Sequence, residues 1–470
     1  MNFKVIENRP LLSILLISLI LRGVYLLLHF PLWWDTHVYL GMAKYIFSLG
    51  QMGVWESYRP LLFPILMGAV WKMGLPLVAA GTMMDVVLSL LVVYLTYKIG
   101  SLFSQKVAVI SSLITAITPL FLKFTGLILV EPLAMVLSLL GVYVFLNGKN
   151  FWAGVLLSLS FLTKFPQGIF FAAAGIAVLF RRERWKEKII SELWLVLGFI
   201  LPALPYFIFN YYRYPTMWEP FISGSWIVST ATWLYSSGAS YYFWAVFAAF
   251  PVLLFFFSYL YDFFRLKLWK EESHLLMMLI CSLTIAYFMY VPRKEDRYLV
   301  TILPLLSILS AYSIALIYDL LKTKSEPAIK AKSFLILVMV LMIIPLPVAL
   351  FLEKPTITAY DEAISIIKER EITGTILSSD PFFISYVDNT LKLLSGTDYA
   401  SIMYEENKGK YELLFLNDCD IPCAPEDTVC AEKMQELMTS IGQENRQLFN
   451  ETVYFTWNKR YCHYYLYVPT

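Results

Sequence analysis

Long hydrophobic runs alternate with short polar loops along this chain of 470 residues. A helix that crosses a membrane needs about 20 predominantly apolar residues, and about eleven runs approach that length. They lie at residues 11–30, 77–98, 107–122, 131–147, 150–163, 165–180, 189–209, 241–261, 275–291, 298–320 and 334–352. Region 150–180 is either a tight hairpin broken at Lys164-Phe165-Pro166 or one long kinked element. The pattern predicts an all-α polytopic membrane protein.

The segment between the first two runs is predicted to be structured. Residues 60–73 contain two prolines and are short for a span. If they crossed the membrane, the basic cluster at 181–188 would fall outside, which the positive-inside rule disfavours. We therefore expect a juxtamembrane helix there, and an amphipathic helix lying on the membrane over residues 38–49. This topology places the N-terminus in the cytoplasm and the C-terminal residues outside.

Composition separates a membrane body from a tail. Overall the chain is 59% hydrophobic and 15% charged, with a mean hydropathy of +0.64. Residues 353–470 carry 10 basic and 19 acidic residues, whereas residues 1–352 carry 27 and 16. We expect a transmembrane catalytic domain over 1–352 and a soluble extracytoplasmic α/β domain over 353–470. Basic residues sit in short loops between apolar runs, which excludes nucleic acid as a partner.

Four of the five cysteines lie in the tail, and an extracytoplasmic location favours disulfide bonds between them. They are Cys419, Cys423, Cys430 and Cys462. Four cysteines allow three pairings, and the sequence does not choose among them. Zinc is the alternative, but paired Cys-x-x-Cys motifs are missing from this stretch.

Two acidic residues are candidates for chemistry at the outer face. Asp35 follows Trp33-Trp34 at the end of the first run, at the level where lipid meets water. Glu131 begins a helix in the sequence Glu131-Pro132, where it also suits the helix dipole. The two could share a divalent cation, Mg²⁺ or Mn²⁺, or divide base and metal-binding roles. The structural explanations are a solvated loop aspartate and a helix-terminal acid.

Basic residues at the same predicted face suggest an anionic ligand. Lys164 interrupts apolar sequence, and Arg293, Lys294 and Arg297 lie in a short turn between two runs. Arg suits bidentate contact with phosphate, and Lys acts as a point charge. A lipid phosphate fits both the charge and the depth. A snorkelling lysine and a solvated turn are the simpler explanations.

Other polar residues are weaker candidates. His37, Tyr39 and Glu56 of the first outer loop are expected near the same site. Asp85, within the second run, is expected to find a partner inside the helix bundle, although a cavity-facing role is open.

In order and spacing, these motifs resemble the GT-C membrane glycosyltransferases. The shared features are an acid after the first span, the Arg59-Pro60-Leu61 stretch, Glu131-Pro132-Leu133, and the Leu162-Thr163-Lys164 turn before Pro166. The branch that the chain resembles most comprises the protein O-mannosyltransferases and aminoarabinose transferases. The resemblance covers roughly residues 1–320.

The resemblance implies a polyprenyl-phosphate sugar as donor, used at the extracytoplasmic face. It implies that Asp35 acts as catalytic base or metal ligand, that Glu131 is the second acid, and that Arg59 and Lys164 contact the lipid phosphate. Several relatives carry Asp-Glu where this chain has Asp35-Thr36, which leaves one carboxylate and puts metal dependence in doubt. The acceptor is a protein, glycan or lipid hydroxyl, and inversion at the sugar is expected from a single displacement.

Two other functions are considered. A transporter or flippase of lipid-linked sugar would place polar sites near the midplane, on broken and often repeated helices. A non-catalytic membrane assembly protein would not require these acids and cations to gather. Both fit the pattern less well than an enzyme.

Overall fold

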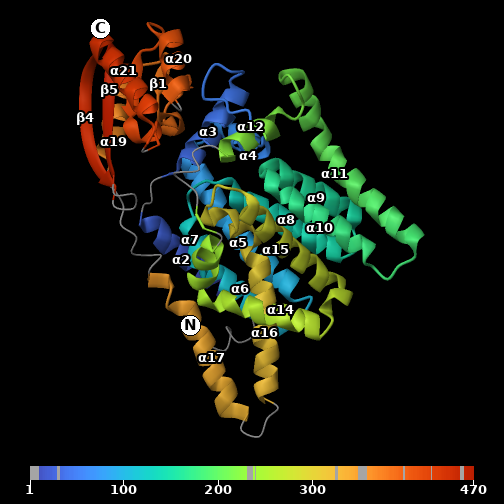
Figure 1. Cartoon of the computed structure of the whole chain (residues 1–470). Helices are drawn as coiled ribbons and strands as arrows, with labels where there is room; N and C mark the ends of the chain where they lie inside the picture. The colour runs from blue at the N-terminus through green and yellow to red at the C-terminus, as the bar shows by residue number, and fades with distance from the viewer. Residues whose placement is uncertain are drawn as a thin grey trace. The chain divides into compact units, whose positions relative to one another are not determined.

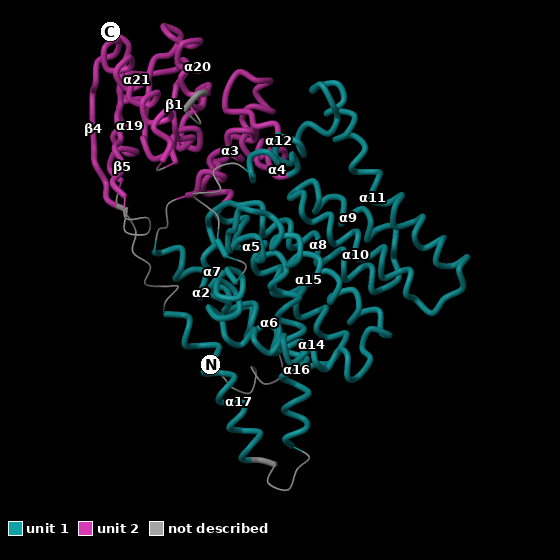
Figure 2. Tube along the Cα trace, viewed as in Figure 1, with its two compact units in different colours: residues 1–29, 58–62, 82–352 teal, residues 30–57, 63–81, 353–470 magenta. Residues whose placement is uncertain are grey.

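The computed structural model describes residues 10–28, 32–229, 237–238, 240–322, 327–347, 357–394, 397–424, 426–455 and 460–470. Its contacts divide the chain into two compact units (Figures 1 and 2). The membrane unit comprises residues 1–29, 58–62 and 82–352, and the C-terminal unit comprises 30–57, 63–81 and 353–470. Residues 29–30 and 348–352, the ends of two predicted spans, lie outside the described ranges. The predicted domains 1–352 and 353–470 stay a prediction.

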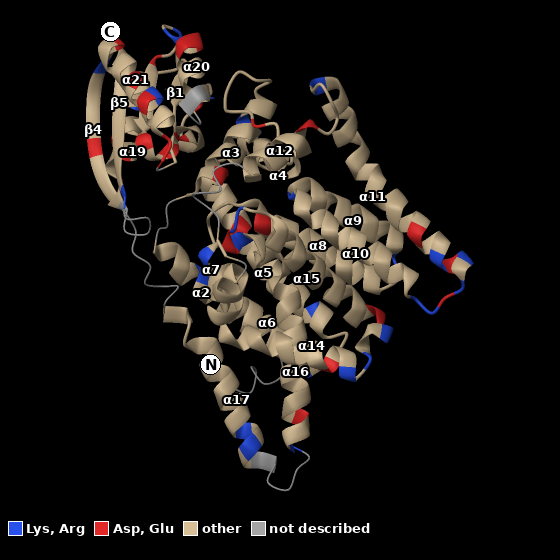
Figure 3. Ribbon diagram, in the orientation of Figure 1, with Lys and Arg blue, Asp and Glu red and all other residues tan. Residues whose placement is uncertain are grey.

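The membrane unit consists of apolar helices. They are α2 (Pro10–Leu27), α5 (Leu77–Gly100), α6 (Gln105–Ile117), α7 (Pro119–Lys123), α8 (Val130–Leu146), α9 (Asn150–Thr163), α10 (Gly168–Leu179), α11 (Trp185–Arg213), α12 (Glu219–Ser229), α14 (Phe255–Arg265), α15 (Glu272–Tyr290), α16 (Leu303–Lys322) and α17 (Pro327–Ile343). Charged residues lie mostly near helix ends, as Figure 3 shows. This distribution is what a lipid environment requires.

Within the described residues, five helical runs are long and apolar enough to cross a membrane. They are α2, α5, α11, α15 and the run Asp296–Lys322. Shorter apolar helices occupy four other predicted spans, as α6, α8, α9 and α10. Region 241–261 is not one helix, because the π-helical turn η2 (Phe243–Ala248) and the 3-10 turn η3 (Pro251–Leu254) precede α14. The count of eleven spans therefore stays a prediction.

The ambiguous region 150–180 forms two helices. Lys164 has an extended backbone, with φ −153° and ψ 110°, and ends α9. Pro166 lies in the 3-10 turn η1 (Phe165–Gln167) that leads into α10. An extended residue and a proline without N–H both break the helical hydrogen-bond pattern. The hairpin alternative placed the break at Lys164-Phe165-Pro166, where it is found; whether the two helices are two spans stays a prediction.

A five-stranded sheet forms the core of the C-terminal residues, as the α/β prediction expected. Its order is β2 (Leu391–Leu393), β1 (Ile376–Ser378), β3 (Leu413–Asn417), β5 (Arg460–Pro469) and β4 (Asn445–Phe455). The first three strands are parallel, and β5 is antiparallel to both of its neighbours. The connecting elements are α19 (Thr358–Glu369), η7 (Pro381–Ser385), α20 (Thr397–Asn407), η8 (Asp418–Asp420) and α21 (Thr428–Glu444).

Alternating side chains of β3 separate the two faces of this sheet. Leu414 and Leu416 pack with Tyr404 and Leu437, so α20 and α21 cover one face. Phe415 meets aromatic rings of α19 and η7 on the other face. The side-chain period of two along a strand explains this division.

Most of the first outer loop belongs to the C-terminal unit, and residues 58–62 belong to the membrane unit. The loop contains α3 (Trp34–Phe47) and α4 (Leu62–Lys72), and both predicted helices are confirmed. The amphipathic pattern is wrong for α3, because every residue from Thr36 to Lys44 is buried. An amphipathic surface helix would leave one face exposed. Residues of η7 and of the following segment cover the side expected to be polar.

Candidate active site

A buried ion pair joins the start of α8 to the end of α9. Glu131 lies in the first turn of α8, and its Oε1 accepts a hydrogen bond from Lys164 Nζ at 2.9 Å. The two side chains are 3% and 12% exposed. Oε2 of Glu131 is buried and has no hydrogen-bond partner among the described residues. Because a buried acceptor without a partner is costly, Oε2 is suited to accept a hydrogen bond from a ligand.

Helix packing fixes this ion pair. Ser160 Oγ donates to Ala134 O at 2.9 Å and ties α9 to α8 about one turn from both charges. On another side α9 meets α11 so closely that a Cβ on Gly154 would lie 2.1 Å from Leu195 O. The backbone that carries Lys164 therefore has little room to move.

The turn before α8 is held by a carboxylate inside the membrane unit. Asp85 of α5 is buried, and its Oδ2 accepts from Gly126 N at 2.9 Å and from Ile128 N at 3.3 Å. Ile128 has φ 55°, a left-handed conformation that is costly for a β-branched residue. Strain of this kind persists where the surroundings impose it. Here the hydrogen bonds from Asp85 hold Ile128 in this conformation, three residues before Glu131. Asp85 thus has partners inside the bundle, as the sequence predicted.

A second set of charges surrounds Tyr298. Glu295 pairs with both Arg293 and Arg297, the latter at 2.5 Å. Tyr298 Oη donates to Glu295 Oε1 at 3.2 Å. Lys164 Nζ lies 5.9 Å from the centroid of the Tyr298 ring. These contacts connect the turn to the Glu131–Lys164 pair.

Together these residues form what we call the charged cluster. Its members are Lys123, Glu131, Lys164, Arg293, Glu295, Asp296, Arg297 and Tyr298. Lys123 belongs to it through an ion pair with Asp296 at 2.8 Å. Four cations stand against three carboxylates, so the cluster carries an excess of one positive charge. Partly buried Arg and Lys in excess favour a phosphate as ligand.

Asp35 lies in the C-terminal unit, in the first turn of α3. It is partly exposed, in contrast to the nine buried residues that follow it. The first turn is the positive end of the helix dipole and stabilises a carboxylate. Because Glu131 belongs to the other unit, a cavity shared by Asp35 and Glu131 stays a prediction.

One family model matches the chain. The model for dolichyl-phosphate-mannose-protein mannosyltransferase matches residues 78–221, a stretch that includes Glu131 and Lys164. No curated protein matched in a sequence search.

Solved structures match most of the chain. ArnT from Cupriavidus metallidurans, bound to undecaprenyl phosphate, has a TM-score of 0.61 at 12% identity, over 97% of each chain. The oligosaccharyltransferase of Archaeoglobus fulgidus, in complex with Zn and sulfate, has a TM-score of 0.60 at 14% identity, over 87% of this chain and 68% of that one. The arabinofuranosyltransferase AftD from Mycobacteria has a TM-score of 0.54 at 11% identity, over 98% of this chain and 40% of that one. The chain has the GT-C glycosyltransferase fold. The resemblance found in the sequence is confirmed at this level.

Within the GT-C fold, Lys294 has a structural role. Its Nζ donates to Phe288 O at 3.0 Å, to Met289 O at 2.7 Å, and to Val291 O. These carbonyls belong to the last turn of α15 and the residue after it, where a cation suits the helix dipole. An ammonium has three N–H donors, and all three are used here. This geometry argues against the predicted contact of Lys294 with phosphate.

The buried residues of α3 also have partners within the fold. His37 Nδ1 forms a hydrogen bond with Ser385 Oγ at 2.6 Å, and burial lowers the pKa of His37 to about 3. The ring of Tyr39 packs edge-on against Phe63 at 5.7 Å. These contacts argue against the predicted site-lining roles of His37 and Tyr39.

Two further predicted residues keep their candidate status. Glu56 is partly exposed in the C-terminal unit. Arg59 belongs to the membrane unit, and its guanidinium lies 5.3 Å from the centroid of the Tyr58 ring. Their predicted roles stay predictions.

A divalent cation in the membrane unit would need Glu131 as one of its ligands. The Lys164 ammonium already neutralises this carboxylate and would repel a second cation beside it. Oε2 alone remains as a ligand atom, whereas Mg²⁺ prefers several oxygen ligands. This argues against a metal held by Glu131 in the membrane unit, and the cation shared with Asp35 stays a prediction.

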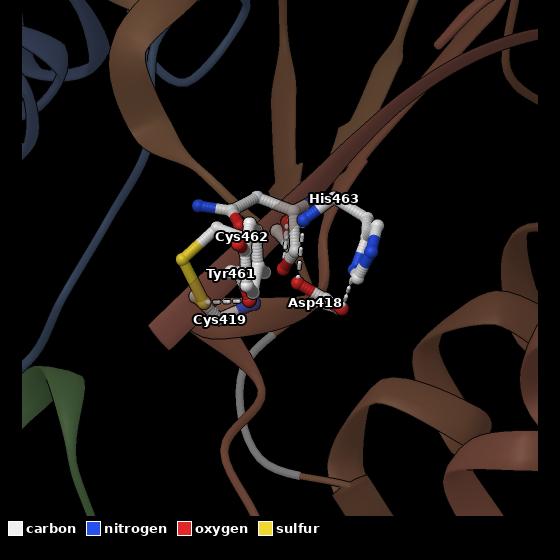
Figure 4. Close-up of a disulfide and its surroundings, with 7 residues drawn as sticks. Asp418, Cys419, Tyr461, Cys462 and His463 are labelled. Atoms are coloured by element: carbon white, nitrogen blue, oxygen red, sulfur yellow. Dashed lines mark hydrogen bonds and ion pairs between the residues drawn. A yellow bond between two sulfur atoms is a disulfide. The ribbon is translucent and has the colours of Figure 1, made fainter. Parts of the chain in front are cut away.

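The predicted disulfides are confirmed, with pairs Cys419–Cys462 and Cys423–Cys430. In Figure 4, Asp418 approaches the first pair and accepts from His463 N at 2.9 Å. Among the described residues, Asp418, Cys419 and Cys462 are the only grouped potential metal ligands. Because both sulfurs are bonded to each other, this group is not a zinc site.

Four members of the charged cluster are not assigned a role by the sequence, namely Lys123, Glu295, Asp296 and Tyr298. The turn from Arg293 to Tyr298 stands out for its cations, and its two acids and its tyrosine do not. The signal was the acid two residues from each arginine, since that spacing lets one carboxylate pair with both.

Proposed function

We propose that this protein is a membrane glycosyltransferase that moves a sugar from a polyprenyl phosphate to an acceptor hydroxyl. The observation that carries the proposal is the buried Glu131–Lys164 pair, joined through Tyr298 to a turn with two arginines. The GT-C fold, the mannosyltransferase family model and the undecaprenyl phosphate bound by ArnT support this function. The N-terminus is cytoplasmic, and reaction occurs at the extracytoplasmic face.

Asp35 is the general base in this proposal. It removes the proton from the acceptor hydroxyl while that oxygen attacks the anomeric carbon. The bond from this carbon to the phosphate oxygen breaks, and its electron pair stays on the phosphate. One displacement inverts the configuration of the sugar.

Cations of the charged cluster bind the lipid phosphate. Lys164, Arg293 and Arg297 stabilise the negative charge that develops on the leaving group. Glu131 holds Lys164 in place through Oε1, and its Oε2 accepts a hydrogen bond from the donor. The acceptor is a hydroxyl of a protein, glycan or lipid.

Transfer of radiolabelled sugar from polyprenyl-phosphate donors, in detergent or liposomes, tests this function. We expect Asp35→Asn to lower kcat by about 100-fold to 10,000-fold, since a general base contributes that much. The matched control is Asp361→Asn, which removes an exposed carboxylate from the first turn of α19. Turnover within twofold of wild type in Asp35→Asn would exclude Asp35 as the base. Absence of transfer by the wild type from every polyprenyl-phosphate donor, with intact folding, would exclude the function.

A further inference from the structure

The C-terminal residues hold α3 at both ends. At the first turns, the buried His37 bonds Ser385 Oγ at 2.6 Å and packs its ring 5.4 Å from that of Phe382. At the last turn, Lys44 Nζ donates to Val387 O at 2.8 Å and pairs with Asp388 at 2.8 Å. The Lys44 side chain is only 4% exposed. A buried lysine is costly without partners, so these contacts fix where it lies.

Between these ends α3 is packed without space. A Cβ on Gly41 would lie 2.5 Å from Val54 Cγ1 and 3.1 Å from Ile384 Cγ2. Contacts closer than about 3 Å require a neighbour to shift, and a close-packed interior resists this. Small movements of α3 along η7 are therefore opposed over its middle turns.

The chain that follows α3 joins the C-terminal sheet. Gly53 pairs with Thr390 in a parallel bridge, next to the start of β2. Gly53 N donates to Asn389 O at 2.9 Å, and Leu391 N donates to Gly53 O at 3.0 Å. Thr390 Oγ1 also donates to Gln51 O at 2.6 Å. Both the helix and the loop after it are thus attached to residues 385–391.

Asp388 also connects α3 to α4. Besides Lys44, it accepts from Trp71 Nε1 at 3.3 Å. Both helices of the first outer loop therefore meet one carboxylate of the C-terminal residues.

Helix geometry places Asp35 opposite these contacts. His37 and Lys44 are seven residues apart, about two turns, and lie on one face. At about 100° per residue, Asp35 is roughly 200° from His37 and roughly 180° from Lys44. The contacts hold the back of the helix, and the partly exposed Asp35 lies on the other side.

We propose that the C-terminal domain positions the catalytic base: it fixes the rotation and register of α3 through His37 and Lys44, and so sets the direction of Asp35. This inference rests on the proposed role of Asp35. His37 and Lys44 are positioning residues, because they act through the helix and do not touch substrate. A displacement of about 1 Å at a catalytic group lowers turnover by up to about 100-fold.

The test compares Lys44→Met with Lys44→Arg in the full-length protein in detergent. Lys44→Met keeps the side-chain length and loses the donors, whereas Lys44→Arg keeps charge and donors. Asp388→Asn, at the 55% exposed partner, weakens the same contact with little risk to folding. Lys408→Met is the matched control, because it breaks an ion pair with Glu444 in the same domain, away from α3.

Two readings are taken for each variant. Hydrogen exchange over residues 34–47 measures how firmly α3 is held, and the transfer assay gives kcat and the donor KM. For Lys44→Met we expect exchange about tenfold faster and kcat about 10-fold to 100-fold lower, with a donor KM within twofold. Lys44→Arg should restore most of the exchange protection of α3 and most of kcat. Asp388→Asn should speed exchange and lower kcat by smaller factors, and Lys408→Met should change neither exchange nor kcat.

Each contrary outcome has a distinct meaning. Unchanged exchange in both Lys44→Met and Asp388→Asn shows that these contacts do not hold α3, and faster exchange with unchanged kcat shows that holding α3 does not serve catalysis. Either result overturns the inference. Failure of the proposed function is recognised separately, by absence of transfer in the wild type. Failure of the proposed role of Asp35 is recognised by wild-type turnover in Asp35→Asn, and the exchange reading depends on neither result.

Discussion

Glu131 in the membrane unit and Asp35 in the C-terminal unit are both first-turn carboxylates, but they are held in different ways. Glu131 is neutralised directly by Lys164, and the turn before it is held by Asp85. The position of Asp35 is set through its helix, which is held by the contacts of His37 with Ser385 and of Lys44 with Val387. One acid is fixed by an opposite charge at its own side chain, and the other by contacts on the far side of its helix.

The two units also differ in how they neutralise buried acids. In the membrane unit, Glu131 and Glu295 pair with cations. In the C-terminal unit, Asp380 accepts from Tyr360 Oη at 2.5 Å, and neither Asp380 nor Asp420 has a cation partner among the described residues. In these examples the membrane unit pairs its buried acids with cations, whereas the C-terminal unit partners Asp380 with a hydroxyl group.

The largest effect is expected from breaking the ion pair of the membrane unit. Lys164→Met removes a phosphate contact and leaves Glu131 buried with no neutralising charge. Loss of one partner of a buried pair costs about 3–5 kcal/mol of stability. We expect the donor KM to rise by about 10-fold to 100-fold, with a much smaller change in the acceptor KM, in steady-state assays of both substrates.

A double variant separates charge from binding. Lys164→Met with Glu131→Gln should recover thermal stability, since no unpaired charge remains, but should not recover donor affinity. Lys106→Met is the matched control, because it breaks an exposed ion pair with Asp319 in the same unit, outside the charged cluster. Equal weakening of donor and acceptor by Lys164→Met would contradict its contact with phosphate.

A smaller effect is expected at the strained turn. Asp85→Leu leaves the N–H groups of Gly126 and Ile128 without their acceptor, at a cost of about 1–3 kcal/mol each. As Ile128 relaxes, Glu131 should shift and kcat should fall by about tenfold. Asp85→Asn retains an oxygen acceptor and should stay close to wild type in the same assay.

The result for Asp85→Asn also tests a second partner of this carboxylate. The fully buried Arg22 interacts electrostatically with Asp85. If Asp85→Asn is as impaired as Asp85→Leu, the charge opposite Arg22 holds this region, and the hydrogen bonds to the turn are not what matters.

The smallest effect concerns pH and the C-terminal unit. Burial, followed by the charge of Asp380, raises the pKa of Asp420 well above its ordinary value. The unfolded carboxyl ionises near pH 3.9, whereas the folded one retains its proton to higher pH. This group therefore lowers stability as the pH rises from about 4 through the raised pKa.

Asp420→Asn removes that penalty. We expect its Tm to exceed that of wild type by about 2–4 °C at pH 7.5, with no difference at pH 4, in thermal unfolding of the full chain in detergent. The buried His37 lowers the stability of both proteins as the pH falls below about 6.5. The test therefore compares the Tm of Asp420→Asn with that of wild type at each pH, so that this shared contribution cancels. A Tm difference that is equal at both pH values would show that Asp420 ionises normally.

Much of the membrane unit could be predicted because its signals are local. Apolar runs predicted α5, α11 and α15, and Lys164 with Pro166 predicted the break in the hairpin. The cysteines predicted disulfides, but their pairing required the fold, since Cys419 bonds Cys462 across 43 residues. Strand β4 gives a weak signal in the sequence, because it is an edge strand paired only with β5 and mixes polar and apolar residues.

The environment of α3 could not be predicted from the pattern. Its periodicity indicated one polar face, but Thr36, His37 and Lys44 are all buried. The residues that cover them lie more than 300 positions away in sequence, and periodicity carries no information about such partners. The carbonyl partners of Lys294 could not be predicted for a related reason, since they come together only in the folded turn, and its predicted contact with phosphate stays untested.

The contact between Lys44 and Val387 has a consequence for biosynthesis, because 343 positions separate the two residues. At about 5–20 residues per second, a ribosome needs about 17–70 s to make the chain between them. For that time α3 has left the ribosome, but the residues that bury it do not yet exist. A nascent chain of this protein therefore exposes an uncovered helix until residues 385–388 have been made, and the cell must protect it from aggregation or degradation in the interval.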